Sequence, residues 1–286
     1  MCSSDLKWGV VLQAQAYLVA FLLALFIAYI ITPQVKEFAI KAGALDAPDA
    51  RKIHTSPIPR MGGLAIYIGF IFAVLASIHV NYEILGLLLG GTVILIVGIV
   101  DDLKQLSAKV KLLGQIAAAL VVVMFDIRID WLTNPFGDMI YLDYLAIPIT
   151  VLWIVAITNT VNLIDGLDGL AAGVSTIASV TIFLVAIEQN LWTVAILSAA
   201  LAGSAVGFLQ HNFNPAKIFM GDTGSMFLGY ILAVVSILGT VKSAATIALI
   251  VPIVALGLPI MDTAFAIIRR YSSGRPIDRK STRLNS

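Results

Sequence analysis

The chain has 286 residues, of which 59% are hydrophobic and 12% are charged. Together with a mean hydropathy of +0.97, this composition excludes a water-soluble globular domain and indicates an integral membrane protein. The net charge of +1 and the lack of a basic stripe with interleaved aromatic residues argue against a nucleic acid partner.

Nine apolar stretches are long enough to cross the hydrocarbon core of a bilayer. They lack the alternating pattern of barrel strands, so their backbone groups must be satisfied within helices. We therefore expect an all-α, polytopic helical bundle with spans near residues 8–31, 62–80, 84–100, 112–125, 145–161, 170–187, 191–209, 225–240 and 244–268.

The basic residues predict the orientation of these spans. Fifteen Lys and Arg side chains fall on one side of the predicted bundle, and only Lys7, Arg128 and Lys242 fall on the other. Loops rich in Lys and Arg stay in the cytoplasm. With nine crossings, the N-terminus is then expected outside and the C-terminus in the cytoplasm.

The longest predicted cytoplasmic loop runs from Thr32 to Met61 and carries Arg51, Lys52, His54 and Arg60. One interpretation is a plain electrostatic anchor of the kind that cytoplasmic loops commonly contain. The other is an anion site, because these side chains can hold phosphate oxygens through charge-assisted hydrogen bonds.

Two adjacent carboxylates, Asp101 and Asp102, stand where the third predicted span ends. Adjacent acids repel each other unless a cation lies between them. Lys104 is one candidate, through an ordinary i, i+3 helix pair with Asp101. Mg²⁺ is the other, because it binds one or two carboxylates together with substrate phosphates.

A second polar cluster follows the fifth predicted span, where Asn162, Asp165 and Asp168 recur every three residues. On a helix this spacing places them along one arc of about 120°. The neighbouring Gly166 and Gly169 would let a ligand or another backbone come close. The alternative is that Asp168 only caps the helix predicted to start near residue 170.

The last predicted cytoplasmic loop carries Asn212 and ends at Asp222 and Thr223, either of which is a good N-cap for the following helix. A helix N-terminus also attracts phosphate through its unpaired N–H groups. A carboxylate between two glycines at such a position suits a metal–diphosphate contact. In the predicted topology, all of these polar clusters reach the cytoplasmic surface.

Four segments, taken together, resemble the polyprenyl-phosphate N-acetylhexosamine-1-phosphate transferases of the glycosyltransferase family 4 type. They are residues 59–63 (Pro-Arg-Met-Gly-Gly), 101–104 (Asp-Asp-Leu-Lys), 162–169 (Asn-Leu-Ile-Asp-Gly-Leu-Asp-Gly) and 219–225 (Phe-Met-Gly-Asp-Thr-Gly-Ser). The resemblance extends in order over roughly residues 32–276 and favours the bacterial GlcNAc-1-phosphate branch.

The resemblance implies transfer of GlcNAc-1-phosphate from UDP-GlcNAc to undecaprenyl phosphate, with release of UMP and a requirement for Mg²⁺, for which Mn²⁺ could substitute. It places the protein in the bacterial plasma membrane, with a cytoplasmic active site and a homodimeric assembly, and makes it an initiator of teichoic acid linkage-unit or O-antigen (lipopolysaccharide) synthesis. Closely related UDP-sugars remain alternatives.

The resemblance also implies roles for individual residues. Asp222 and Asn162 would bind the metal, and Asp101 or Asp102 would orient or deprotonate the acceptor phosphate. Asp165 would serve either the metal or the base contact. The remaining assigned residues are expected to contact substrate: Lys104 and Lys111 the phosphates, Asp168 and Asn212 the UDP, and Arg51, His54 and Arg60 other anionic groups.

Three other functions are alternatives to this one. A phospho-MurNAc-pentapeptide transferase is the nearest, because it shares the same motifs. A CDP-alcohol phosphotransferase would place Ala-Arg shortly after its first Asp-Gly, which the segment from Asp165 lacks. A secondary transporter would place its coupling residues near the membrane midplane, within repeated halves.

We expect one transmembrane transferase domain over residues 8–276. Residues 1–7 and 277–286 read as polar sequence unrelated to the fold. Members of the family continue after the position of Arg275-Pro276 into a His-rich loop and further helices, so the domain is expected to be truncated before that loop.

Overall fold

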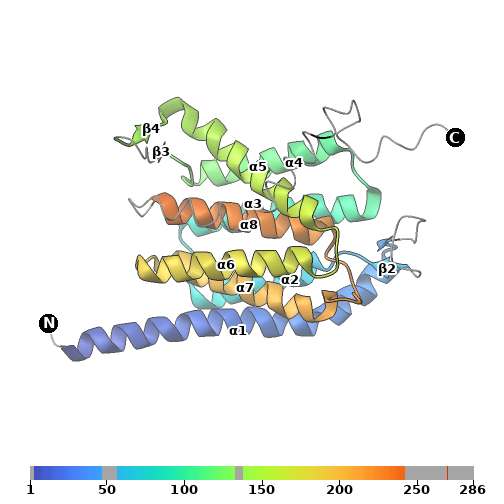
Figure 1. Ribbon diagram of the computed structural model, residues 1–286, viewed down its shortest axis with the longest axis horizontal. Helices are drawn as coiled ribbons and strands as arrows, with labels where there is room; N and C mark the ends of the chain where they lie inside the picture. Colours follow the sequence, from blue (N-terminus) through green and yellow to red (C-terminus); the bar gives the residue numbers. More distant parts are fainter. Residues whose placement is uncertain (1–2, 47–56, 133–137, 242–268, 270–286) are drawn as a thin grey trace.

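The computed structural model describes residues 3–46, 57–132, 138–241 and 269. Within them the chain is almost entirely helical, as Figure 1 shows. The predicted all-α class is therefore confirmed. The helices are α1 (Ser3–Lys41), α2 (Gly63–Ser77), α3 (Tyr82–Lys104), α4 (Ala108–Met124), α5 (Ala146–Ile164), α6 (Leu170–Glu188), α7 (Trp192–Asn212) and α8 (Gly221–Val241).

The other elements are small. Strand β1 (Leu45–Asp46) pairs antiparallel with β2 (Ile58–Pro59), and β3 (Trp131–Leu132) pairs antiparallel with β4 (Ile140–Tyr141). A short 3-10 turn, η1 (Asp143–Leu145), leads into α5. In Figure 1 the two hairpins lie at opposite ends of the bundle.

Six of the described helices are long and apolar enough to cross a membrane. They correspond to six of the nine predicted spans and include residues Gln15–Lys41, Tyr82–Lys104, Asp143–Ile164, Leu170–Glu188, Trp192–Asn212 and Gly221–Gly239. The predicted spans 62–80 and 112–125 form the shorter helices α2, with 15 residues, and α4, with 17. The predicted span 244–268 lies outside the described residues.

Helices α7 and α8 form the centre of the bundle. In their most apolar segments 78% and 89% of the residues are buried, against 28% in α1. Helix α1 packs along α7 at Gly203 and Gly207, where an added Cβ would collide with the carbonyl oxygens of Phe21 and Leu25. Two glycines four residues apart thus let the two backbones touch, as is common between membrane helices.

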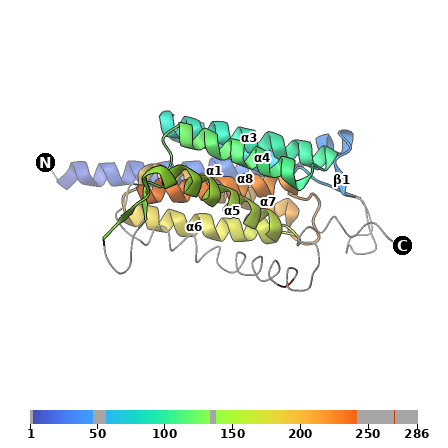
Figure 2. The same cartoon turned by 90° about the horizontal axis from the view of Figure 1, so that it is seen from above.

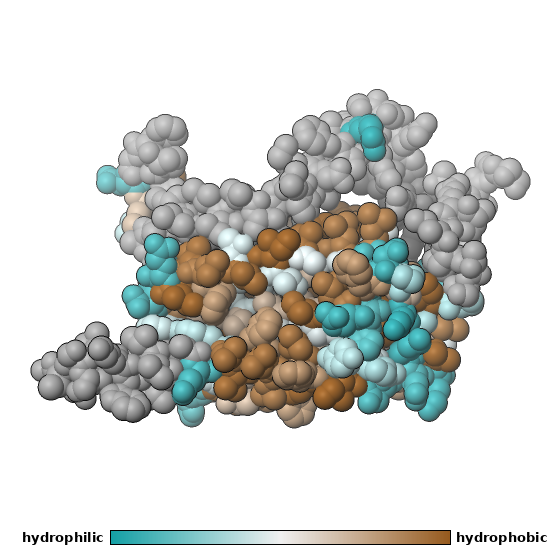
Figure 3. Space-filling model, turned by 60° about the horizontal axis from the view of Figure 1, so that its bottom comes forward, coloured by the Kyte–Doolittle hydropathy of each residue, from teal (hydrophilic) through white to brown (hydrophobic). Residues whose placement is uncertain are grey.

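The outer helices carry the surface expected to face lipid. Leu113, Leu152 and Ile177 are each about two-thirds exposed although they are large and apolar. In Figure 3, apolar residues occupy the middle of the visible face, and hydrophilic residues gather toward its ends. This distribution fits a protein whose helices cross a bilayer with their apolar middle parts in the hydrocarbon core.

Helix α1 does not end near residue 31 as predicted but continues to Lys41, although Pro33 lies inside it. Proline leaves the carbonyl four residues before it without its helical partner. Here that carbonyl, of Tyr29, lies 3.1 Å from Nε2 of His211 on α7, which can donate the missing hydrogen bond. The predicted loop therefore starts ten residues later, because a side chain from another helix replaces the lost contact.

Strands β1 and β2 lie between the end of α1 and the start of α2 and connect this end of the bundle to α8. The backbone N–H of Arg60 donates to the carbonyl of Ala44, and Arg60 forms a parallel bridge with Phe219, just before α8. Gly63 packs against Gly224 so closely that a Cβ would collide with the Gly224 backbone. The glycine pair after Arg60 thus joins the start of α2 to the start of α8.

Candidate active site

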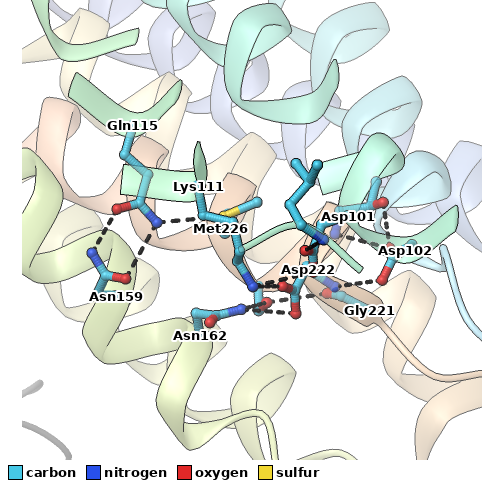
Figure 4. A network of polar contacts seen from close by, with 12 residues as sticks. Asp101, Asp102, Lys111, Gln115, Asn159, Asn162, Gly221, Asp222 and Met226 are labelled. Carbon is cyan, nitrogen blue, oxygen red and sulfur yellow. Dashed lines mark hydrogen bonds and ion pairs between the residues drawn. The ribbon is translucent and has the colours of Figure 1, made fainter. Parts of the chain in front are cut away.

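Four helix ends meet at one end of the bundle: α3 and α5 end there, and α4 and α8 begin there. Figure 4 shows that their side chains form one polar network. Asp101 and Asp102 come from α3, Lys111 from α4, Asn162 from α5 and Asp222 from α8. The structure thus brings together side chains from three of the predicted polar clusters.

Asp102 holds the first turn of α8. Its Oδ1 accepts the backbone N–H of Asp222 at 3.0 Å, and its Oδ2 accepts the N–H and hydroxyl of Thr223 at 3.1 and 2.5 Å. A helix N-terminus has unpaired N–H groups, and a carboxylate satisfies them well. Asp102 is 2% exposed. It is therefore a cap supplied by another helix, and the prediction that Asp222 or Thr223 caps α8 is wrong.

Gly221 makes this contact between helices possible. Its φ is +71°, and a Cβ at this position would collide with the carboxylate of Asp102. Positive φ is costly for residues with a side chain. On the other side of Asp102, Nη2 of Arg60 donates to its backbone carbonyl at 2.7 Å. A cation at the carbonyl end of α3 also interacts favourably with the helix dipole.

Lys111 bridges the two carboxylates that face the interior of the site. Its ammonium group contacts Oδ2 of Asp101 at 3.1 Å and also forms an ion pair with Asp222. Oδ1 of Asp101 accepts the backbone N–H of Leu106 at 2.6 Å. The predicted i, i+3 pair of Asp101 with Lys104 is wrong: Lys104 is exposed, and the cation comes from the next helix.

Asn162 completes the contacts of Asp222. Its Nδ2 donates to Oδ1 of Asp222 at 3.1 Å and to the hydroxyl of Ser225 at 2.8 Å. The side chain of Asp222 is 26% exposed and that of Asp101 is 8% exposed. Asp222 is therefore the carboxylate of this pair that a ligand can reach more easily.

The predicted helical arc of Asn162, Asp165 and Asp168 is wrong. Helix α5 ends at Ile164, and only Asn162 lies on it. The chain turns through the two glycines, with Gly169 at φ +73°, before α6 begins. Glycine favours such turns. The two glycines beside the acids therefore end the helix here, instead of opening room for a ligand or another backbone as predicted.

Asp165 lies in this turn. Burial and the negative charges of Asp222 and Asp102 raise the pKa of Asp165 to about 7. No hydrogen bond to its carboxylate is found from the described residues. Within the described part of the chain, the site thus contains an acidic group whose charge no neighbouring cation neutralises.

Asp168 and Asn212 connect the α5–α6 turn to the loop before α8. Oδ2 of Asp168 accepts from Nδ2 of Asn214 at 3.2 Å and from the backbone N–H of Ala216 at 3.0 Å, so its predicted alternative as the cap of α6 is wrong. Asn212, 3% exposed, accepts from the N–H of Gly169 and donates to the carbonyl of Ile218. Both side chains fix the shape of the loops beside the acids.

The basic residues divide into two groups. Arg60 lies at the site, where it contacts the carbonyl of Asp102, and its buried Nε has no hydrogen-bond partner among the residues that the structure describes. Arg51 and His54 lie outside the described residues, as does the predicted tail 277–286. The anion-site hypothesis for that loop therefore remains a prediction.

Metal binding can be judged from the donor set. In the described part of the chain, no three His, Cys, Asp or Glu side chains are gathered as a preformed metal cage. The site nevertheless collects the carboxylates of Asp101, Asp102, Asp165 and Asp222 against the cations Lys111 and Arg60. An excess of carboxylate oxygens fits a hard divalent cation such as Mg²⁺, which takes few protein ligands and completes its shell with phosphates and water.

Sequence reasoning missed several residues of the network. Thr223 is predicted only as a helix cap and Ser225 only as part of a motif, and the amides of Gln115 and Asn159, which bond each other just inside the site, have no predicted role. A usable signal existed for Gln115, because it stands four residues after Lys111 and therefore on the same helix face.

The fold and the site define a multi-pass membrane protein with an acidic site at the ends of its helices. Residues 84–240 match the family model described as "Glycosyl transferase family 4". The chain belongs to this family. The matched segment contains every described acidic residue of the site.

Three relatives show the range of the family. The chain is 49% identical to the "Probable undecaprenyl-phosphate N-acetylglucosaminyl 1-phosphate transferase" of Bacillus subtilis, over 91% of this chain and 73% of that protein. It is 37% identical to the "Decaprenyl-phosphate N-acetylglucosaminephosphotransferase" of Mycolicibacterium smegmatis, over 95% and 74%. It is 34% identical to the "Phospho-N-acetylmuramoyl-pentapeptide-transferase" of a Thermoanaerobacter species, over 88% and 81%.

Proposed function

We infer that the protein transfers GlcNAc-1-phosphate from UDP-GlcNAc to undecaprenyl phosphate and releases UMP. The observation that carries this conclusion is the acid–lysine network of Asp101, Lys111, Asn162 and Asp222, found in a chain 49% identical over most of its length to a relative named for this reaction. The product would be the first lipid-linked intermediate of a cell-wall polymer, such as a teichoic acid linkage unit or O-antigen.

The relatives favour the GlcNAc substrate over the MurNAc-pentapeptide substrate. Identity to the Bacillus protein is 49%, against 34% to the phospho-N-acetylmuramoyl-pentapeptide transferase. A transporter is disfavoured, because the polar side chains gather at one end of the helices instead of at a midplane site.

The site would open to the cytoplasm in a membrane crossed nine times, with the N-terminus outside. Support comes from the basic residues near the described site, Lys104, Lys109, Lys111 and Lys217, since Lys and Arg are enriched on the cytoplasmic side. An acceptor phosphate reaches such a site from the bilayer, and a nucleotide sugar reaches it from the cytoplasm. A homodimer in the membrane is a further expectation.

Mg²⁺ would be held by Asp222, with Asn162 and Asp165 beside it, and Mn²⁺ would fit the same oxygen donors. When bound, the ion supplies positive charge that stabilises the charge developing on the departing UMP. Asp222 suits this role because it is the more exposed of the two carboxylates bonded to Lys111.

The reaction is an in-line displacement at the β-phosphorus of UDP-GlcNAc. An oxygen of the acceptor phosphate forms the new bond to phosphorus, and the bond between the β-phosphorus and the oxygen that leaves with UMP breaks. Lys111 would neutralise phosphate charge from its place between two carboxylates, and Lys104 would assist from the rim. Most of the catalysis would come from positioning and charge neutralisation, as is usual for phosphoryl transfer.

Of the two adjacent acids, Asp101 is assigned to the acceptor phosphate. Its Oδ2 faces Lys111 in the interior of the site, whereas both oxygens of Asp102 are used by α8. Asp165 serves the metal or acts as the base. Asp168 and Asn212 would shape the uridine pocket through the two loops they join, and Arg60 would hold Asp102 in place.

The substrate assignment is tested by competition. Purified protein with undecaprenyl phosphate and Mg²⁺ is given equal amounts of UDP-GlcNAc and UDP-MurNAc-pentapeptide, and the lipid products are resolved by mass spectrometry. We expect the GlcNAc diphospholipid and UMP. Formation of the MurNAc-pentapeptide lipid alone would assign the protein to the other branch of the family.

A further inference from the structure

A second polar layer lies one helical turn inside the site. Each of its members stands three or four residues from a site residue on the same helix: Gln115 from Lys111 on α4, Asn159 from Asn162 on α5, and Met226 from Asp222 on α8. Residues with this spacing lie on one face of a helix. Figure 4 shows both layers in one view.

The two amides of this layer bond each other reciprocally. Nδ2 of Asn159 donates to Oε1 of Gln115 at 2.6 Å, and Nε2 of Gln115 donates to Oδ1 of Asn159 at 3.3 Å. Asn159 also donates to the carbonyl of Val155 at 2.8 Å, and Nε2 of Gln115 lies 3.5 Å from the sulfur of Met226. Gln115, only 1% exposed, thus links α4 to α5 and to α8.

Helix α4 has few other polar links to its neighbours among the described residues: besides the contacts of Lys111 and Gln115, the hydroxyl of Tyr82 on α3 donates to the carbonyl of Met124 at 3.1 Å. It is a peripheral helix of 17 residues, and Val110, Leu113 and Met124 on its outer face are 48%, 66% and 71% exposed. Apolar contacts tolerate a small rotation of a helix more easily than buried hydrogen bonds do, because a rotated polar group loses its partner. Lys111, however, must stay between Asp101 and Asp222, which lie on two other helices.

We propose that Gln115 and Asn159 form a positioning pair, which fixes the rotation of α4 and so keeps the ammonium group of Lys111 between the two carboxylates. The pair touches no substrate and acts through Lys111. The inference rests on the proposed transferase function for its effect on catalysis. Its structural part, the placement of Lys111 relative to Asp222, can be measured independently of activity.

The physical basis is the cost of leaving a partly buried amide without a partner. If Gln115 becomes apolar, the amide of Asn159 loses the acceptor of its shortest hydrogen bond. The helices then shift, or water enters, and either change moves Lys111. A displacement of about 1 Å in a catalytic group can lower turnover by about a hundredfold.

The kinetic test compares the wild type with Gln115→Met and with the reciprocal exchange Gln115→Asn with Asn159→Gln. Ser236→Ala is the matched control, because it removes a 3.1 Å hydrogen bond from Trp153 that also joins α5 and α8 but lies away from the site. For Gln115→Met we expect kcat to fall about tenfold to a hundredfold with KM for UDP-GlcNAc within about twofold. The exchange should recover most of kcat, and the control should retain it.

A second arm uses cross-linking and needs no turnover. In a Cys2→Ser background, Lys111→Cys and Asp222→Cys are combined and treated with a short bismaleimide. We expect the cross-linking rate to fall several-fold when Gln115→Met is added and to stay unchanged when Ser236→Ala is added. If the wild type makes no lipid product, the proposed function fails, and this arm alone decides the positioning role.

Three results would overturn the proposal. The first is unchanged kcat in Gln115→Met. The second is an equal loss in Ser236→Ala, which would show a general sensitivity of the bundle. The third is a cross-linking rate that Gln115→Met does not alter. If Gln115→Met fails to fold, the reciprocal exchange decides: recovered activity and cross-linking support the pair, and their loss in a folded protein refutes it.

Discussion

The two adjacent acids of α3 should respond to the same substitution in opposite ways. Asp102→Asn is expected to destabilise the protein, because both oxygens of Asp102 accept hydrogen bonds from the first turn of α8. Whichever way the new amide turns, its NH₂ group faces one backbone N–H. Asp101→Asn keeps an oxygen for the N–H of Leu106 and removes the charge and the acceptor opposite Lys111, which retains its ion pair with Asp222.

The magnitude follows from these contacts. Leaving one buried N–H without an acceptor costs about 1–3 kcal/mol. Removing a negative charge from a partly buried helix N-terminus costs up to about 2 kcal/mol more. We therefore expect Asp102→Asn to lower the free energy of unfolding by about 3 kcal/mol and Asp101→Asn to lower it by less than about 1 kcal/mol. Turnover should be abolished in Asp101→Asn although the protein stays folded.

The assay combines thermal unfolding in detergent, followed by tryptophan fluorescence, with lipid product formation at a temperature where both variants are folded. Asp102→Asn should unfold at least about 6 °C below the wild type. The reasoning would be refuted by an Asp102→Asn protein of wild-type stability without activity, or by an Asp101→Asn protein with full activity.

Three further outcomes are expected. Gly221→Ala should reduce both stability and turnover, because a Cβ at φ +71° meets the Asp102 carboxylate. Gly173→Ala, with open space around its Cβ, should reduce neither. Equal behaviour of the two variants in thermal unfolding would contradict this. Lys111→Met should lower kcat by about a hundredfold or more, whereas the exposed neighbour Lys109 should tolerate the same change; steady-state kinetics of both variants decide the point. Chelation with EDTA should abolish product formation, and added Mg²⁺ should restore it. The unfolding temperature should hardly shift, because protein groups alone cap α8. Irreversible loss of activity would argue against an exchangeable ion.

The helices and the general place of the site could be predicted, and the reason is local. An apolar stretch of some twenty residues is visible in the sequence itself, and polar groups at its ends must gather at the membrane surface. Asp101, Asp222 and Asn162 therefore meet as expected. The same reasoning failed at Asp165 and Asp168, because a spacing of three residues predicts a common face only while the helix continues.

The partners within the site could not be predicted, because they come from different helices. Lys104 was a natural neighbour of Asp101 in sequence, yet Lys111 is its partner once α4 folds back against α3. Asp102 looked equivalent to Asp101 until the first turn of α8 was placed against it. Which of two identical side chains caps another helix and which faces Lys111 inside the site depends on packing between helices, and no pattern within one helix records it.

The central claim is that the network around Asp222 carries Mg²⁺-dependent transfer of GlcNAc-1-phosphate. The most direct measurement is the formation of lipid-linked product from radiolabelled UDP-GlcNAc and undecaprenyl phosphate, with and without Mg²⁺, by the wild type, Asp222→Asn and the control Asp130→Asn. Asp130 is an exposed acid paired with Arg128, outside the network. The account predicts Mg²⁺-dependent product in the wild type and the control and none in Asp222→Asn. Equal product from Asp222→Asn and the wild type would contradict it.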